Sequence, residues 1–290
     1  MAYANRVQRV ADHVRSHLDH NLSLEALARV AGFSPYHFHR IFRATTGETL
    51  THFTQRCRLE RAAYLMKSAP GRTLHSIAAE VGFSAQSDFS RVFRRHYGIA
   101  PSRWDRRSRL APAVREDYET VVATARANRP TPTVQTRRHP PARVAYIRVR
   151  NPFQGRQLAD GYNRLRSCLD TLQFDWHSAS LLGLSWDNYE TTPIEQVSFD
   201  LGFVVDHTVP AAGPLGVHQF PAVQAVEVHC QGPLVNIAVA WDYLYDEWLP
   251  HSRFEPEDLP AIKRFRSCPD QSAWADWNVD CSIAIRPQMG

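Results

Sequence analysis

Arginines stand at matching places in a pattern that the chain contains twice. The first copy, "GFSPYHFHRIFR", starts at Gly32, and the second, "GFSAQSDFSRVFRR", starts at Gly82. A guanidinium group can make two parallel hydrogen bonds to a phosphate or to the O6 and N7 atoms of guanine. The pattern therefore offers the chemistry of nucleic-acid recognition twice in one chain. The matching arginines are Arg40, Arg43, Arg91 and Arg94.

The distribution of charge agrees with this interpretation. Residues 1–110 hold 18 Lys and Arg against 8 Asp and Glu, whereas residues 111–290 hold 16 against 21, and nearly all the basic residues are Arg. A basic half beside an acidic half suggests that the first half meets a polyanion. No apolar run is long enough for a membrane span, and the first residues are too charged for a secretory signal. We therefore expect a cytoplasmic protein without a membrane partner.

Other kinds of site find little support in the sequence. The five cysteines form no CxxC pair and no zinc-like spacing with histidine, so we expect reduced, buried thiols and no metal site. No Ser-His-Asp arrangement or phosphate loop is present that would indicate an enzyme. We therefore predict a protein that is not an enzyme and that holds no cofactor.

The repeated pattern requires helices that present its arginines. Apolar residues recur at helical spacing through residues 6–104. Ser34 is a plausible N-cap, Pro35 suits the first helical position, and Gly32 permits a sharp turn before them. Each copy thus predicts a helix-turn-helix unit. The second helix of each unit would fit the DNA major groove, with the two helices about 34 Å apart, and the long helix predicted over residues 51–68 would fix that separation.

Residues 6–107 resemble the DNA-binding domain of the AraC/XylS family of bacterial transcription regulators. The resemblance rests on "LSLEALARVAGFSPYHFHRIFR", "LERAAYLM" and "SIAAEVGFSAQSDFSRVFRRHYGIAPSRW". It implies an all-α double helix-turn-helix domain, to which we assign residues 1–108. It also implies that the base-facing residues are Tyr36, His39, Arg40, Gln86, Ser87, Ser90 and Arg91. Four further arginines are expected to hold phosphates, which orient the domain without reading sequence, namely Arg43, Arg94, Arg95 and Arg103.

The chain changes character after the basic half. Prolines cluster at positions 130, 132, 140 and 141, so we predict a linker over residues 109–140 with one short helix at 116–125. Beyond it, alternating strand patterns and helical patterns follow one another in two β-α-β-β halves. We therefore predict a multidomain protein whose second domain, residues 141–290, is an α+β fold with a mainly antiparallel sheet and two helices.

The second part of the chain also suggests a small-molecule site. It contains six of the seven tryptophans. A cleft lined by aromatic rings with a few polar groups is a usual binding site, although for any one ring a place in the core is at least as plausible. The tryptophans are Trp176, Trp186, Trp241, Trp248, Trp274 and Trp277.

Residues of about 140–288 are similar to the GyrI-like effector-binding domain. The similarity rests on "LLGLSWDNYETTPIEQVSFD" and "HCQGPLVNIAVAWDYLYDEWLPHS". In several relatives this domain carries a hydrophobic ligand pocket between its two halves. The resemblance therefore implies a small aromatic or amphipathic effector. The residues expected to contact it are Trp186, Asp187, Trp241, Tyr245, Trp248, Lys263 and Phe265.

One position departs from this family. Where relatives usually place a glutamate that pairs with cationic compounds, this chain has Lys263 in "PAIKRF". A buried lysine would repel a cation and lose its own hydration, so we do not carry over the cationic preference. An anionic or neutral aromatic ligand fits better, or Lys263 pairs with Asp200 and closes the site. Some relatives are hydrolases that use the same glutamate, and Lys263 argues against that chemistry here.

Together these features predict a transcription regulator, by resemblance an activator. Its first domain would bind promoter DNA and its second a small-molecule effector, with RNA polymerase as a further partner. The alternative is that the second domain is a hydrolase, a ligand-sequestering module or a protein-binding module fused to a DNA-targeting domain.

Overall fold

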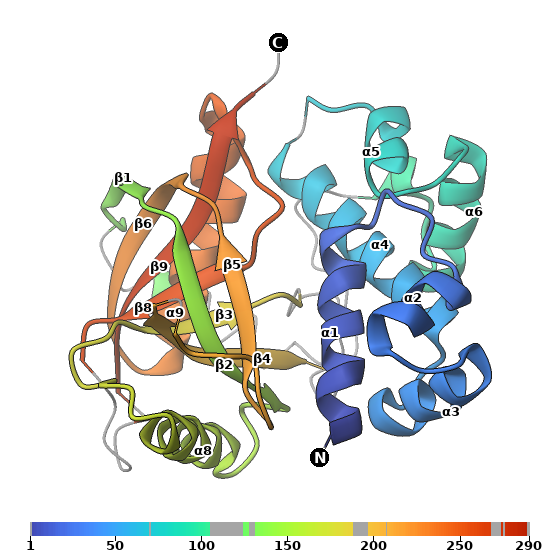
Figure 1. The fold of residues 1–290 in the computed structure, drawn as a ribbon. Coiled ribbons are helices and arrows are strands. Elements are labelled where there is room, and N and C mark those ends of the chain that lie inside the picture. The colour runs from blue at the N-terminus through green and yellow to red at the C-terminus, as the bar shows by residue number, and fades with distance from the viewer. Residues whose placement is uncertain are drawn as a thin grey trace. The chain divides into compact units, whose positions relative to one another are not determined.

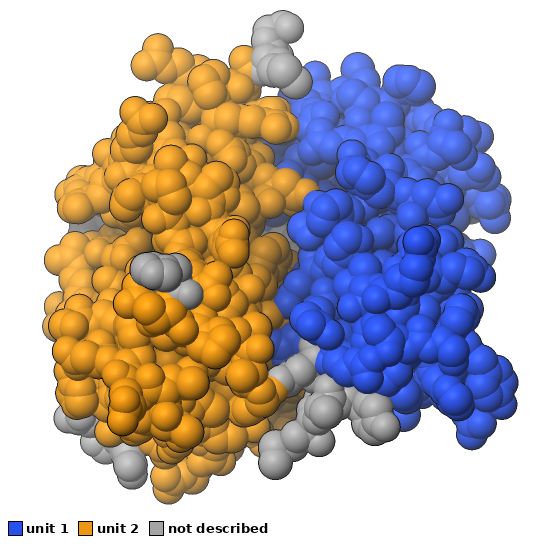
Figure 2. All heavy atoms as spheres, viewed as in Figure 1, with its two compact units in different colours: residues 1–110 blue, residues 111–290 orange. Residues whose placement is uncertain are grey.

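Helices make up the first part of the chain and a β-sheet dominates the second. The computed structural model describes residues 2–69, 71–104, 124–127, 131–187, 197–206, 208–267, 274 and 276–288. The chain divides into two compact units, residues 1–110 and 111–290 (Figure 2). The multidomain fold class predicted from the sequence is confirmed. Among the described residues, no helix is both long and apolar enough to cross a membrane.

The first unit contains two helix-turn-helix pairs joined by a long helix (Figure 1). The first pair is formed by α2 and α3, and the second by α5 and α6. Helix α4 joins them, as expected. The helices are α1 (Ala2–Ser16), α2 (Leu24–Ala31), α3 (Pro35–Thr46), α4 (Leu50–Ser68), α5 (Leu74–Glu80) and α6 (Gln86–Tyr97), followed by a 3₁₀ turn at Pro101–Arg103.

The turns of the two pairs have the same backbone hydrogen bonds. The amide of Phe33 donates to the carbonyl of Ala28, and the amide of Phe83 donates to that of Ala78, both at 2.9 Å. The glycines before them, Gly32 and Gly82, have positive φ angles of 65° and 84°. A left-handed residue at this place ends the first helix and reverses the chain, which glycine does with little strain.

The two recognition helices differ at their first residue. Ser34 caps α3 by accepting a hydrogen bond from the amide of His37, and Pro35 occupies the first turn, as predicted. Helix α6 begins after Ala85, which makes no side-chain cap. The second copy has one residue more between Gly82 and Phe93 than the first copy has between Gly32 and Phe42. Since α3 and α6 are equally long, this extra residue lies between the turn and the helix.

Helix α4 takes part in two separate hydrophobic cores. Its first half contributes Leu50, Phe53 and Cys57 to the core of the first pair, and its second half contributes Leu59 and Leu65, among others, to that of the second. At roughly 100° per residue, these two sets fall on nearly opposite sides of the helix. The helical spacing of apolar residues predicts that Val30 of α2 is buried, together with five residues of α4, namely Phe53, Leu59, Ala62, Ala63 and Leu65. The five residues of α4 are buried, but Val30 is 36 % exposed, since Ala31 takes the place in the core.

An arginine of α4 binds the segment between α1 and α2, close to the second turn. Arg58 donates from Nε to the carbonyl of Leu18 at 3.0 Å and from Nη2 to that of His20 at 3.1 Å. Gly82 lies against this arrangement so closely that a Cβ atom there would be 2.1 Å from the Leu18 carbonyl oxygen and 2.8 Å from Arg58 Nη2. The absent side chain therefore lets the second turn approach the segment between α1 and α2.

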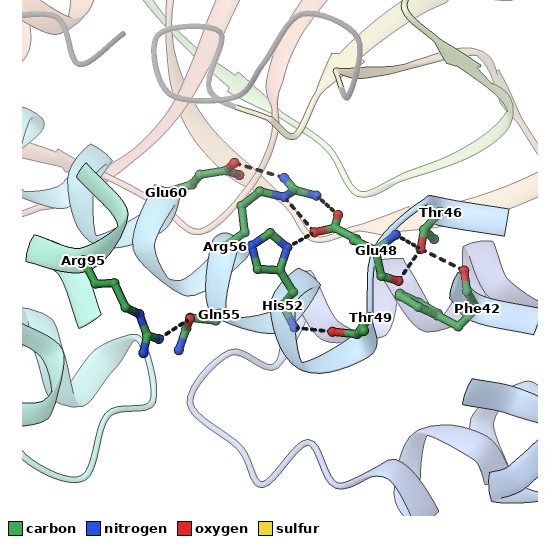
Figure 3. A network of polar contacts seen from close by, with 9 residues as sticks. All are labelled: Phe42, Thr46, Glu48, Thr49, His52, Gln55, Arg56, Glu60 and Arg95. Carbon is green, nitrogen blue, oxygen red and sulfur yellow. Dashed lines mark hydrogen bonds and ion pairs between the residues drawn. The ribbon is translucent and has the colours of Figure 1, made fainter. Parts of the chain in front are cut away.

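A buried ion pair stabilises the start of α4 (Figure 3). Arg56 is 5 % exposed and lies between Glu48 and Glu60, with N–O distances of 2.7 and 3.0 Å. Glu48 also accepts a hydrogen bond from His52 at 2.8 Å if that nitrogen carries the proton. Removal of the cation would leave two largely buried carboxylates side by side, which is strongly unfavourable.

The second unit is built on one antiparallel sheet with the strand order β1-β6-β9-β8-β3-β4-β2-β5, and β7 pairs with β9. The predicted halves are confirmed as β2-α8-β3-β4 and β6-α9-β8-β9, and they meet where β3 pairs with β8. The strands are β1 (Val134–His139), β2 (Ala142–Arg150), β3 (Leu181–Ser185), β4 (Ser198–Val205), β5 (Gly216–Phe220), β6 (Val223–Gly232), β7 (Phe254–Pro256), β8 (Ala261–Phe265) and β9 (Trp277–Pro287); the helices are α8 (Gln157–Thr171) and α9 (Leu234–Asp242).

One face of the sheet forms the main core with α8 and α9. Leu165 of α8 and Ile237 of α9 pack there against sheet residues such as Leu201 and Val279. The opposite face carries a smaller apolar cluster around Val144, Leu182 and Leu184. Each face takes alternate residues of every strand, so the pairing register decides which side chains share a face.

The sheet starts earlier than the sequence suggested. Strand β1 lies within residues 109–140, which we predicted to be a linker, and it pairs with β6 along its whole length. Its residues are mostly exposed, so it lacks the apolar alternation that marks a strand. The helix predicted at 116–125 lies almost wholly outside the described residues, although residues 124–127 are helical. The bounds 1–108 and 141–290 otherwise remain predictions.

We predict that Gly82→Ala destabilises the protein more than Gly98→Ala does. Both glycines have positive φ angles, so either alanine incurs the left-handed strain of about 1–2 kcal/mol. Only at Gly82 does the new Cβ atom also meet the Leu18 carbonyl, whereas nothing lies within 4 Å at Gly98. Overpacking should add about 1–3 kcal/mol. Urea unfolding followed by helical circular dichroism measures the difference, and equal losses for the two variants would contradict the proposed close contact.

Candidate nucleic-acid interface and small-molecule site

Helices α3 and α6 each bury an apolar face and expose a polar one. Phe38 and Phe42 in α3, and Phe89 and Phe93 in α6, are fully buried. The side chains predicted to contact DNA are exposed, except Ser90, which is half-buried. These exposed residues are Tyr36, His39, Arg40, Arg43, Gln86, Ser87, Arg91, Arg94 and Arg95. The structure thus groups them on the outward faces of two helices, while their individual roles remain predictions.

In each recognition helix, one predicted base-reading arginine contacts a residue one turn earlier. Arg40 Nη1 donates to the hydroxyl of Tyr36 at 3.3 Å, and its guanidinium carbon lies 5.9 Å from the centre of that ring. Arg91 Nη2 donates to Asp88 Oδ1 at 3.0 Å. Exposed contacts of this kind contribute little free energy, so both guanidinium groups can exchange them for DNA. Asp88 was not predicted from the sequence, although its spacing to Arg91 could have indicated this contact.

Arg95 connects the second recognition helix to α4. Its Nη2 donates to Gln55 Oε1 at 3.1 Å (Figure 3). Burial lowers the pKa of the neighbouring His96, and the charges of His52, Arg56 and Arg95 lower it further. The end of α6 therefore lies against the start of α4, and Arg95 has an intramolecular partner besides the phosphate contact predicted for it.

A hollow of about 660 Å³ opens between the two helix-turn-helix pairs. It is lined by His39 of α3, Gln55 and Arg58 of α4, and Ser84 from the second turn, among other residues. The polar groups of His20, Asn21 and Thr51 also line it, and the sequence analysis did not select them. Their positions depend on how the two copies pack together, which a linear pattern does not reveal.

In the second unit, Lys263 lies inside the main core. It is 2 % exposed, and its Nζ donates to Ser185 Oγ at 2.9 Å. The amine is 5.1 Å from the ring centre of Phe199 and 5.3 Å from that of Trp241. Burial lowers the pKa of Lys263 to about 8, and the thiols of Cys281 and Cys230 offset part of this shift.

The predicted alternative, an ion pair between Lys263 and Asp200, is wrong. Gly183 lies opposite Lys263, while the next residue, Leu184, lies opposite Asp200. Because successive residues point to opposite faces, the amine and the carboxylate are separated by the sheet. The register of three strands decides this, and it could not be derived from the sequence pattern.

Asp200 instead accepts hydrogen bonds on the other face of the sheet. Both its oxygens lie 2.6 Å from guanidinium nitrogens of Arg148, and its Oδ2 is 2.9 Å from His218 Nε2 and 3.0 Å from Trp186 Nε1. Burial raises the pKa of this carboxyl, but Arg148 and His218 outweigh that effect and hold the pKa well below its usual value. His218 also stacks on Tyr146, with 4.0 Å between ring centres.

The seven residues predicted to contact the effector therefore do not form one group. Trp241, Lys263 and Phe265 belong to the helix-covered face, and Tyr245 lies near Trp241 with 6.1 Å between ring centres. Trp186 binds Asp200 on the opposite face. Trp248 also packs against the core of the helix-covered face, where it stacks near Phe254 with 6.2 Å between ring centres. Asp187 accepts a hydrogen bond from the amide of Ser198 at 2.7 Å.

Two cavities of the second unit differ in their relation to these residues. One, of about 630 Å³, is lined by charged residues of β1, β6 and β9, such as Arg137, Glu227 and Asp280, and by none of the seven predicted residues. The other, of about 420 Å³, includes Trp248 and Phe254.

Of the five cysteines, the four that the structure describes are free thiols, and all but the half-buried Cys168 are buried, while Cys268 lies outside the described residues.

Comparisons with known proteins agree with this architecture. Residues 27–107 match a helix-turn-helix domain family, and residues 132–286, more than half of the chain, match the GyrI-like small molecule binding domain. Regulatory protein SoxS of Salmonella typhimurium is 33 % identical over 110 residues, which are 38 % of this chain and 100 % of that protein. Transcriptional regulator Rob of the same organism is 30 % identical over 33 % of this chain and 32 % of its own length.

Among solved structures, the C-terminal domain of AraT, a response regulator from Geobacillus stearothermophilus, is 26 % identical with a TM-score of 0.34, over 40 % of this chain and 95 % of that one. The helical half thus matches proteins named as regulators, and the sheet half matches a domain named for small-molecule binding. The chain belongs to the AraC-type helix-turn-helix regulators and carries a GyrI-like small-molecule binding domain as its second half.

Proposed function

We propose that this regulator activates transcription, with RNA polymerase as a partner, and that a small effector bound by its second unit controls the activity. The observation that carries the proposal is the pair of exposed, arginine-bearing helices packed on one shared helix, α4. A rigid pair of this kind can enter two segments of the major groove of one operator without a second subunit. Promoter DNA lies in the cytoplasm, where we expect the protein to act.

The exposed residues divide into two kinds of DNA contact. Arg40 and Arg91, each near the middle of its helix, would read guanine, and Gln86 at the start of α6 would read adenine. Arg43 and Arg94 follow one turn later and would bind phosphates, which position the helices but carry no sequence information. Selection from a random DNA library by the purified full-length chain tests the proposal, because a true regulator enriches one operator sequence.

The environment of Lys263 supports an aromatic effector that is neutral or anionic. The amine lies among Phe199, Trp241 and Ser185, so a ligand there would meet aromatic rings and one hydrogen-bonding cation. A cationic ligand would face repulsion inside a medium of low dielectric constant. The hydrolase alternative needs a carboxylate for acid–base chemistry, and an amine at this position does not supply one. We therefore propose a sensor domain that is not an enzyme.

We predict that Arg40→Ala and Arg94→Ala weaken DNA binding in different ways. Loss of a base contact at Arg40 should reduce discrimination at one base step by about 1–3 kcal/mol. Loss of a phosphate contact at Arg94 should weaken binding to all sequences alike and make it less dependent on salt. Titration of operator variants at several salt concentrations measures both effects. If Arg40→Ala left the relative affinities of operator variants unchanged, its base-reading role would be wrong.

We also predict that the second unit prefers an anionic aromatic compound to a cationic one. Benzoate should quench tryptophan fluorescence in the full-length protein, whereas benzyltrimethylammonium should not. A hydrogen bond to a charged group contributes about 1.5–3 kcal/mol, so Lys263→Met should weaken benzoate binding at least about tenfold. Arg164→Met, which removes a cation from the outer part of α8, is the control. Stronger binding of the cationic compound would overturn the proposed effector class.

A further inference from the structure

Lysine is rare in this chain, and one of its two lysines is buried. Lys67 and Lys263 are the only lysines, and every other member of the 34 Lys and Arg residues is Arg. Lys67 is half-buried on α4, whereas Lys263 is 2 % exposed in the sheet core. A chain that uses arginine for nearly all its cations thus places an amine beside Phe199 and Trp241 in the sheet core.

An amine differs from a guanidinium group in one chemical respect that matters here. A guanidinium group does not lose its proton in proteins, whereas a buried amine can, and a neutral amine is a nucleophile. Burial lowers the pKa of Lys263 to about 8, so its neutral fraction near neutral pH is on the order of 100-fold larger than that of an ordinary lysine.

The neighbours of the amine suit a reaction with a flat, apolar molecule. Phe199 and Trp241 place aromatic rings within 5.1 and 5.3 Å of Nζ. The hydroxyl of Ser185 lies 2.9 Å from Nζ and can both donate and accept a proton. Across the strand, Gly183 has no side chain, and the ring of Phe199 takes that space at 2.2 Å from where a Cβ atom would stand.

The cover over Lys263 is an irregular helix. Helix α9 ends at Asp242 and continues as a π-helix over Tyr243–Trp248. Trp241 and Tyr245, on either side of this change, are only half-buried. A π-helix has poorer hydrogen-bond geometry than an α-helix and occurs frequently at functional sites. A ligand that reaches the amine from this side must displace the ring of Trp241, which lies 5.3 Å from Nζ.

We propose that Lys263 captures an aromatic aldehyde as a reversible imine. This inference rests on the proposed effector site and narrows the neutral ligands to carbonyl compounds. The lone pair of neutral Nζ attacks the carbonyl carbon, and the electrons of the C=O π bond move to oxygen. Ser185 relays a proton from nitrogen to that oxygen, which gives a carbinolamine. The carbinolamine then loses its hydroxyl group and the remaining N–H proton as one water molecule, and the nitrogen lone pair forms the C=N bond. The reaction requires no oxidant or reductant.

Imine formation also removes the charge of Lys263 from a buried position. A protonated amine loses hydration when it is buried, which is costly. A neutral imine carries no such charge, and its aromatic substituent can stack against Trp241. The free energy released in this way favours capture of the aldehyde by Lys263 over capture by an exposed amine.

Reductive trapping in the full-length protein tests the inference. Benzaldehyde is added in the presence of sodium cyanoborohydride, which reduces an imine to a stable benzylamine, and peptide mass spectrometry locates the benzyl group. We expect modification of Lys263 at least tenfold faster than modification of Lys67. Lys67→Arg should leave the rate at Lys263 unchanged, and Ser185→Ala should lower it. Lys263→Arg, which keeps the positive charge, should abolish the adduct at this position.

Two results would overturn the inference. One is an unmodified Lys263 in the wild-type protein, and the other is modification of Lys67 as fast as that of Lys263. Both are read from the wild-type chain, so neither depends on whether a variant folds. Benzoate quenching measured on the same sample separates the two proposals. If benzoate quenches the fluorescence but no adduct forms, the imine is rejected and the effector site is retained. If neither quenching nor an adduct is observed, the effector site is rejected as well.

Discussion

The DNA-binding half depends on one helix that has two apolar sides. Helix α4 cannot be amphipathic in the usual sense, because each of its halves packs into a different core and the two cores lie on nearly opposite sides. The recognition helices are thus fixed relative to each other through a single rigid element. The Arg58 contacts to Leu18 and His20, and the bare backbone of Gly82, fix the same relationship a second time.

In the second unit, the alternation of the sheet separates opposite charges. Asp200 has Arg148 and His218 on one face, and the amine of Lys263 lies among aromatic rings and thiols on the other. If the register placed Asp200 and Lys263 on the same face, the carboxylate and the amine would form a buried ion pair. As it is, the helix-covered face contains the amine of Lys263, whose pKa burial lowers.

Much of this architecture could be predicted from the sequence, and the reasons for the exceptions are physical. The repeated turn glycines, the Ser34 cap and the apolar spacing are local signals, so the helical pairs were correctly placed. Val30 was misplaced because neighbouring Ala31 satisfies the same helical spacing. The separation of Lys263 from Asp200, and of Trp186 from Trp241, depends on strand register, which joins residues far apart in the chain. Strand β1 carries charged residues on both faces, so its sequence lacks the alternation of apolar and polar residues that predicts a strand.

The packing at the junction of the two sheet halves limits which residues can stand there. Strands β3 and β8 pair over four residue positions, and one of these pairs is Gly183 with Lys263. The ring of Phe199 in β4 occupies the space that a side chain at Gly183 would need, 2.2 Å from where its Cβ atom would stand. A larger residue at position 183 would therefore displace this ring and disturb both the pairing of the two halves and the surroundings of the amine.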